Sequence, residues 1–208
     1  RYAGIDLWDD AAALDALVGG QERAVAAVRA AIPAISAAAQ AIAPRLKAGG
    51  RLVYAGAGSS VSIAAQDGSE LPGTFGFPRE RIVFLIAGGS AALLDIDGAA
   101  EDDDAAGEGD VAALGDVSGD VVIAVPASGP TPYTPPAARR AKAGGALVVG
   151  IANNPRAPLL AMADRPILLD SGPEVVAGST RMGAGTAQKC ALGALSTLVN
   201  IRLGHVHD

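Results

Sequence analysis

The chain has 208 residues and a formal net charge of −6. Half of its residues are hydrophobic and 18% are charged, which excludes a disordered chain. An acidic surface without a Lys/Arg cluster argues against nucleic acid as a partner, because it would repel the phosphate backbone. The longest β-rich apolar run, residues 121–127, is too short to span a membrane, so we expect no membrane partner. A single cysteine, Cys190, cannot form an internal disulfide, which indicates a reducing cytoplasm.

The first 50 residues are expected to form a segment that packs on the core. Residues 1–20 are Asp-rich and contain a Gly pair, so we predict irregular structure there. From residue 21 to 47 the apolar residues recur at spacings of three and four, which predicts an amphipathic helix that Pro33 kinks or splits. The predicted buried stripe consists of Val25, Val28, Ile32, Ile35, Ala39, Ile42 and Leu46.

The remaining residues, 51–208, are expected to form one compact α/β domain. Five short apolar runs are continuous rather than alternating, which is typical of strands covered on both faces, and helix-compatible stretches separate most of them. These runs are residues 51–55, 81–87, 120–125, 146–151 and 166–169. We therefore predict a three-layer α-β-α sandwich with a five-stranded parallel sheet. Residues 179–203 predict a largely buried helix, and the acidic stretch 99–110 a low-complexity loop.

Ser and Thr residues stand at three expected helix entrances. They occur in Gly56-Ala57-Gly58-Ser59-Ser60, in residues 126–132 and in Gly178-Ser179-Thr180. Ligands of parallel sheets bind beyond the carboxyl ends of the strands, and a helix amino terminus with free amides suits a phosphate. A phosphorylated small molecule is one interpretation, and ordinary helix caps are the other. A dinucleotide fingerprint is excluded because Val61 stands where its third glycine would be.

Three glutamates lie near these loops, namely Glu70, Glu101 and Glu174. Two of them could act as a paired acid and base. The plainer interpretations are a helix C-terminal cap for Glu70, a solvated acidic run for Glu101 and a helix-dipole partner for Glu174. His205 and His207 are interpreted as an exposed tail, and no metal site is predicted.

Several strings in the chain resemble those of N-acetylmuramic acid 6-phosphate etherases. They begin with Gly56-Ala57-Gly58-Ser59-Ser60, Ser69-Glu70-Leu71-Pro72 and Thr74-Phe75-Gly76. They continue with Ala127-Ser128-Gly129, Thr131-Pro132-Tyr133 and residues 172–176. The longest block covers residues 178–182 and 184–189. The resemblance runs in order from about residue 5 to the end of the chain.

This resemblance implies a sugar isomerase (SIS) fold with flavodoxin-type topology, and a homodimer with its site near the subunit interface. It implies cleavage of the D-lactyl ether of N-acetylmuramic acid 6-phosphate, without a cofactor, to N-acetylglucosamine 6-phosphate and D-lactate. Glu70 matches the proton donor and Glu101 the other catalytic glutamate, assigned here as the base. The implied phosphate and sugar ligands are Gly58, Ser59, Ser60, Ser128, Gly129, Thr131, Glu174, Ser179 and Lys189.

The chain departs from the family at loop positions that are usually basic. Ser62, Pro130 and Gly183 stand where Arg, Arg and Lys are usual, and the chain ends before the family's C-terminal helical region. Each lost charge-assisted hydrogen bond would weaken anion binding by about 1.5–3 kcal/mol. Two alternatives therefore stay open: a non-catalytic phosphosugar-binding regulator of the glucokinase-regulator type, and an aldose–ketose phosphate isomerase.

Overall fold

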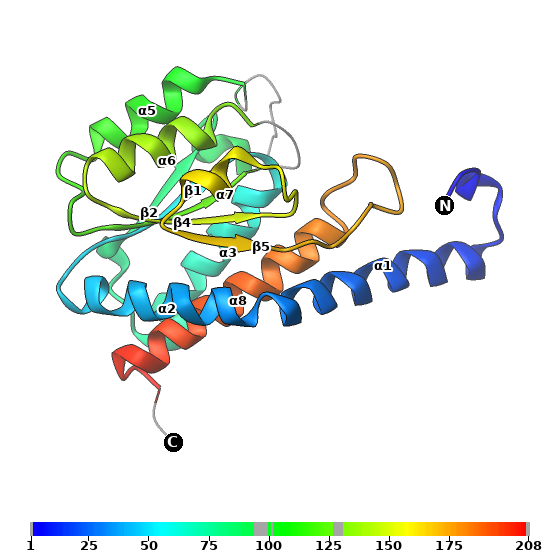
Figure 1. Cartoon of the computed structure of the whole chain (residues 1–208), viewed down its shortest axis with the longest axis horizontal. Helices are drawn as coiled ribbons and strands as arrows, with labels where there is room; N and C mark the ends of the chain where they lie inside the picture. Colours follow the sequence, from blue (N-terminus) through cyan, green and yellow to red (C-terminus); the bar gives the residue numbers. More distant parts are fainter. Residues whose placement is uncertain (1, 94–99, 101, 127–130, 207–208) are drawn as a thin grey trace.

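The computed structural model describes residues 2–93, 100, 102–126 and 131–206. Its centre is a five-stranded parallel sheet in the order β2-β1-β3-β4-β5, which confirms the predicted fold class (Figure 1). The strands are β1 (Leu52–Gly56), β2 (Ile82–Ile86), β3 (Val121–Val125), β4 (Leu147–Ala152) and β5 (Arg165–Leu168). Each lies within one or two residues of a predicted apolar run.

The strand order makes β1 and β3 neighbours at the middle of the sheet. The chain moves outward from β1 to β2 and then crosses back to β3, which pairs with β1 from Leu52 opposite Val121 to Gly56 opposite Val125. Consequently the loops that follow β1 and β3 leave the same edge of the sheet side by side. Such a crossover point is where open α/β sheets bind ligands.

Helices cover both faces of the sheet, and each face has its own apolar core. One face carries α1 (Asp10–Ala30), α2 (Ile32–Lys47), α3 (Gly58–Phe75) and α8 (Gly183–Leu203). The other carries α5 (Asp104–Ala113), α6 (Thr134–Ala143) and α7 (Pro158–Met162) (Figure 1). Short 3-10 helices are η1 (Ile5–Leu7), η2 (Arg79–Arg81) and η3 (Ser90–Leu93).

The amino-terminal segment is more helical than its composition predicts. Asp9 caps α1 by accepting a hydrogen bond from the Ala12 amide at 2.9 Å, so the prediction of irregular structure over residues 1–20 is wrong beyond residue 9. Gly20 stays inside the helix because α1 passes close to Val175, where an added Cβ would lie 3.2 Å from a side-chain methyl. Tertiary contact thus overrides the low helix propensity of glycine.

The predicted split near Pro33 is confirmed. The axes of α1 and α2 are bent by 56° at Ala31, and Pro33 occupies the first turn of α2, where its missing N–H costs nothing. Because of the bend, the predicted buried stripe is not continuous. Val25 and Ile32 are 46% and 55% exposed, whereas the other five predicted residues are buried. Within the described residues no single helix has the length and apolar character to cross a membrane; only the bent pair α1 and α2, taken together, does.

Two other boundaries differ from prediction. Most of the acidic stretch 99–110 that the structure describes is not a loop, because α5 begins at Asp104 and Asp103 caps it through the Ala106 amide at 2.9 Å. The final helix begins at Gly183 rather than at residue 179, and it is largely buried, as predicted.

The amino ends of the strands are braced by buried and half-buried charges. Asp120 accepts hydrogen bonds from the Arg51 backbone amide at 2.8 Å and from Arg51 Nη2 at 2.6 Å, which ties the start of β1 to the start of β3. Arg45 donates to the carbonyls of Ser118 and Gly145, both at 2.8 Å. This end of the sheet is therefore held by polar contacts, and the opposite end carries the predicted ligand loops.

Candidate functional site

The first loop of the site joins β1 to α3. Gly56 allows β1 to lie against β3, because a Cβ there would come within 2.3 Å of the Val125 carbonyl oxygen. Gly58 opens α3 with a φ of 56°, and no side chain caps the helix. Ser59 is half-buried and Ser60 is buried in its first turn. The uncapped amides and two hydroxyls make this the part of the site best suited to an anion.

The second loop follows β3 and includes residues that lie outside the described part of the chain. Ser128 and Gly129, both predicted phosphate ligands, are among these residues. Thr131 is buried just beyond them. Thr134 begins α6, and its buried hydroxyl has no hydrogen-bond partner within the described residues.

The third loop precedes α8, and its Glu174 side chain caps the amino terminus of that helix. Its Oε2 accepts from the Gly183 amide at 2.9 Å and its Oε1 from the Ala184 amide at 2.8 Å. The interpretation of Glu174 as a helix-dipole partner is therefore confirmed. Ser179, which is half-buried, lies in the same loop. Contact of Glu174 or Ser179 with a sugar stays a prediction.

Glu70 lies in the body of α3 rather than at its end, so its interpretation as a C-terminal cap is wrong. Gln66 Nε2 donates to its Oε1 at 3.0 Å, and Lys189 Nζ of α8 lies 3.6 Å from its Oε2. The structure thus brings together two predicted site residues, Glu70 and Lys189, on an exposed surface. Glu101, the other predicted catalytic residue, lies outside the described residues.

A buried polar cluster lies beneath this surface. Asp67 accepts hydrogen bonds from the Tyr54 hydroxyl at 2.7 Å and from the Ser196 hydroxyl at 2.9 Å. Burial raises the pKa of the Asp67 carboxyl above its ordinary value, although both hydrogen bonds act in the opposite direction. Burial, followed by the negative charge of Asp67, raises the pKa of Tyr54 as well. The cluster joins β1, α3 and α8 directly below Glu70.

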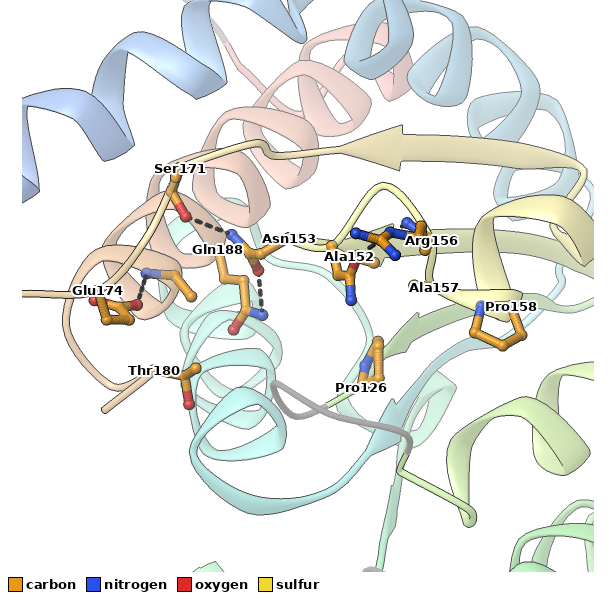
Figure 2. Close-up of a pocket in the computed structure, with 13 residues that line it drawn as sticks. Pro126, Ala152, Asn153, Arg156, Ala157, Pro158, Ser171, Glu174, Thr180 and Gln188 are labelled. Atoms are coloured by element: carbon orange, nitrogen blue, oxygen red, sulfur yellow. Dashed lines mark hydrogen bonds between the residues drawn. The ribbon is translucent and has the colours of Figure 1, made fainter. Parts of the chain in front are cut away.

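A cavity of about 290 Å³ lies at the carboxyl ends of β3, β4 and β5, against the start of α8 (Figure 2). Glu174 and Thr180 line one side, and Arg156 is the only cationic side chain among the described lining residues. Asn153, Ser171 and Gln188 form a hydrogen-bonded row along the wall. Its lining includes Glu174, one of the predicted ligand residues.

Sequence reasoning missed Asn153, Arg156 and Gln188. A signal for the first two was present, since Asn153-Asn154 directly follows the fourth predicted strand and Arg156 comes just after. The rule that ligands bind beyond strand ends applies to this loop as well. Gln188 lies in the block 184–189 that resembles the family, but its place on the cavity wall depends on where α8 passes the sheet.

The described residues contain no group of three or more His, Cys, Asp or Glu side chains that could hold a metal ion.

Comparison with known proteins gives two kinds of relative. The family described as glucokinase regulatory protein N-terminal SIS domain matches residues 34–141, just over half of the chain. Solved structures share the fold at low identity: a putative sugar-phosphate isomerase from Listeria monocytogenes has a TM-score of 0.65 at 19% identity and covers 96% of this chain and 94% of its own. A phosphoheptose isomerase from Francisella tularensis has a TM-score of 0.62 at 23% identity, over 92% of this chain and 98% of its own.

Much closer relatives are named N-acetylmuramic acid 6-phosphate etherase. The protein from Deinococcus radiodurans is 53% identical over 99% of this chain, which spans 68% of that relative. The protein from Streptomyces avermitilis is 46% identical over 92% of this chain, which spans 62% of that relative. The chain therefore belongs to the N-acetylmuramic acid 6-phosphate etherase family and carries a SIS domain.

Proposed function

We propose that this chain binds a phosphorylated amino sugar and cleaves the D-lactyl ether of N-acetylmuramic acid 6-phosphate. The products are N-acetylglucosamine 6-phosphate and D-lactate, so the net reaction consumes one water. The observation that carries this proposal is the 53% identity to a relative of that name over nearly the whole chain. In this proposal residues 51–208 form the phosphosugar domain and residues 1–50 pack on it.

The proposed reaction is an elimination followed by a hydration. A base removes the proton from C2 of the open-chain sugar, lactate leaves from C3 and water then adds to the alkene. Glu101 serves as the base, and Glu70 protonates the departing ether oxygen. Lys189 supports this arrangement by its position, because its Nζ lies 3.6 Å from Oε2 of Glu70 and helps to orient that side chain. No cofactor is required by this sequence of steps.

The phosphate is assigned to the helix amino termini at the carboxyl edge of the sheet. The first turn of α3 supports this assignment, since it is uncapped and holds Ser59 and Ser60. Thr131, together with Ser128 and Gly129, completes the cradle. Oriented amides and hydroxyls then replace the cations that stand in the family at the positions of Ser62, Pro130 and Gly183.

We also propose that the protein is a homodimer. Leu14, Val18 and Val25 lie on one face of α1 and are 60%, 57% and 46% exposed, because spacings of four and seven return to the same side of a helix. The helix buries only Gly20, Ala24 and Val28 within the chain. A second copy that covers this stripe would remove the apolar surface from water.

D-lactate release from N-acetylmuramic acid 6-phosphate tests the proposed activity. We expect release by the wild-type chain and its loss in Glu70→Gln, with N-acetylglucosamine 6-phosphate still raising the melting temperature of both. Release that is equal in Glu70→Gln would contradict the role of Glu70.

The match to the glucokinase regulatory protein family favours one second candidate, a phosphosugar-binding regulator without catalysis. It predicts sugar phosphate binding with no lactate release at saturating substrate. The likeness to isomerases concerns the fold alone at 19–23% identity, and aldose–ketose exchange followed by NMR in deuterated water tests that reaction separately.

A further inference from the structure

A row of side-chain amides lines the cavity at the start of α8. Asn153 follows β4, Ser171 follows β5 and Gln188 lies in α8, so three segments distant in sequence contribute to it (Figure 2). Gln188 is only 3% exposed, which is unusual for a polar side chain on a cavity wall. Its amide therefore has an orientation that the surroundings determine.

The orientation of the row follows from one main-chain carbonyl. Asn153 Nδ2 lies 3.0 Å from the Leu169 carbonyl oxygen, which can only accept a hydrogen bond. The nitrogen of Asn153 must face that carbonyl, and it also lies 3.4 Å from Ser171 Oγ. The oxygen of Asn153 is therefore left to accept.

Gln188 is oriented in turn by Asn153. Its Nε2 donates to Asn153 Oδ1 at 2.9 Å, so the carbonyl oxygen Oε1 points away from Asn153 (Figure 2). No described residue donates a hydrogen bond to this oxygen. Because Gln188 lines the cavity, a ligand or water there can donate a hydrogen bond to this oxygen.

The two charged side chains on the wall, Glu174 and Arg156, do not offer an equivalent acceptor. Both carboxylate oxygens of Glu174 already accept amides of α8, at 2.9 and 2.8 Å. Arg156 is a donor at every position of its guanidinium. Asn153 Oδ1 already accepts from Gln188, and Asn154 Oδ1 from the Arg156 backbone amide at 2.9 Å, so Gln188 Oε1 is the side-chain amide oxygen left to accept from a ligand.

We propose that Gln188 determines specificity for the 2-acetamido group, by accepting a hydrogen bond from the N–H on C2 of the sugar. An amide N–H can only donate, whereas a hydroxyl can rotate to donate or accept, so a fixed acceptor discriminates best for the amide. A hydroxyl at C2 must give up its rotational freedom to donate to this acceptor, so the hydrogen bond contributes less to the binding of a C2-hydroxyl sugar than to that of the N-acetylated one. Asn153 and Ser171 are positioning residues that hold the acceptor. This inference rests on the proposed function, since it concerns the same phosphosugar site.

The test compares two ligands that differ at C2. Calorimetry measures the binding of N-acetylglucosamine 6-phosphate and glucose 6-phosphate to the wild type and to Gln188→Met, a variant of similar volume. We expect Gln188→Met to bind the N-acetylated sugar at least about tenfold more weakly, and to change glucose 6-phosphate binding by less than about threefold. Gln40→Met makes the same substitution at an exposed position of α2 and should change neither affinity.

Ser171→Ala provides a second variant, because it loosens Asn153 without removing either amide. It should reduce the preference for the N-acetylated sugar by about two- to threefold, which is less than Gln188→Met. If the wild type binds both sugars and each variant keeps the wild-type preference, this inference is overturned while the proposed function stands. If the wild type binds neither sugar, the proposed function fails, and this inference with it.

Discussion

The carboxylate of Glu70 on α3 and the ammonium of Lys189 on α8 face each other, with Oε2 3.6 Å from Nζ. Their side chains are 54% and 42% exposed, so water and salt screen the pair. An ion pair of this kind contributes at most about 1 kcal/mol to folding. Its principal effect is therefore on the orientation and charge environment of Glu70.

We expect Lys189→Met to reduce D-lactate release by about tenfold, because Glu70 loses the side chain that helps to orient it. The free energy of unfolding, measured with urea, should change by less than about 1 kcal/mol. Arg139→Met removes a comparable exposed pair, in which Nη1 lies 3.9 Å from Oε1 of Glu108, and should leave both quantities unchanged. Unaltered lactate release in Lys189→Met would contradict the assignment.

The buried carboxyl of Asp67 predicts a pH dependence of stability. Burial raises its pKa in the folded state, so the folded state holds the proton more tightly than the unfolded chain does. The contribution of Asp67 is therefore fully present below the ordinary pKa of 3.8 and is lost as the pH rises through the raised value. Asp67→Asn has no carboxyl to ionise, so it should not show this loss of stability. Relative to the wild type, its free energy of unfolding should therefore increase as the pH rises through this window. Urea unfolding of both proteins from pH 3 to 7 measures it, and a shift in the opposite direction is inconsistent with a raised pKa.

Glu174 predicts a change in stability at the start of α8. Glu174→Ala removes the acceptor for two helix amides, so we expect a loss of about 1–2 kcal/mol, as for other N-terminal caps. Glu174→Gln keeps one carbonyl oxygen and should lose about half as much. Chemical unfolding measures both. Equal stability of Glu174→Ala and the wild type would show that water replaces the cap.

Two glycines of α5 predict opposite effects of the same substitution. A Cβ on Gly107 would lie 2.2 Å from the Tyr133 carbonyl oxygen, so Gly107→Ala must push α5 away from α6 and should cost at least about 2 kcal/mol. A Cβ on Gly109 meets nothing within 4 Å, so Gly109→Ala should stabilise the protein by about 0.5–1 kcal/mol through helix propensity. Thermal unfolding of the two variants tests both signs, and a stabilising Gly107→Ala would refute the close approach of the two helices.

The exposed stripe on α1 predicts the behaviour of the proposed dimer. Leu14→Asp combined with Val18→Asp should convert the dimer to a monomer at micromolar concentration, because each buried leucine or valine contributes about 1.5–3 kcal/mol. Sedimentation measures the mass. Ala12→Asp, on the opposite side of the helix, should leave the dimer intact. A wild type that sediments as a monomer rules out this proposal.

The sheet was predictable because its strands are continuous runs rich in Val, Ile and Leu. Such runs are typical of strands that helices cover on both faces of the sheet. The extent of α1 was not, since the contact that accommodates Gly20 is made by Val175, far along the chain. The Ser-bearing entrance of α3 was predictable from local sequence alone. The partnership of Gln188 with Asn153 was not, because it depends on the path of α8 past the end of β4.

The brace between Arg51 and Asp120 has a consequence for how this scaffold tolerates change. It ties the start of β1 to the start of β3, at the end of the sheet away from the predicted ligand loops, so this part of the scaffold is held without the predicted ligand residues. Ser62 in α3 and Gly183 at the start of α8 take no part in this brace. A protein of this design is a suitable starting point for retargeting to other phosphorylated sugars, provided that substitutions are confined to the carboxyl edge.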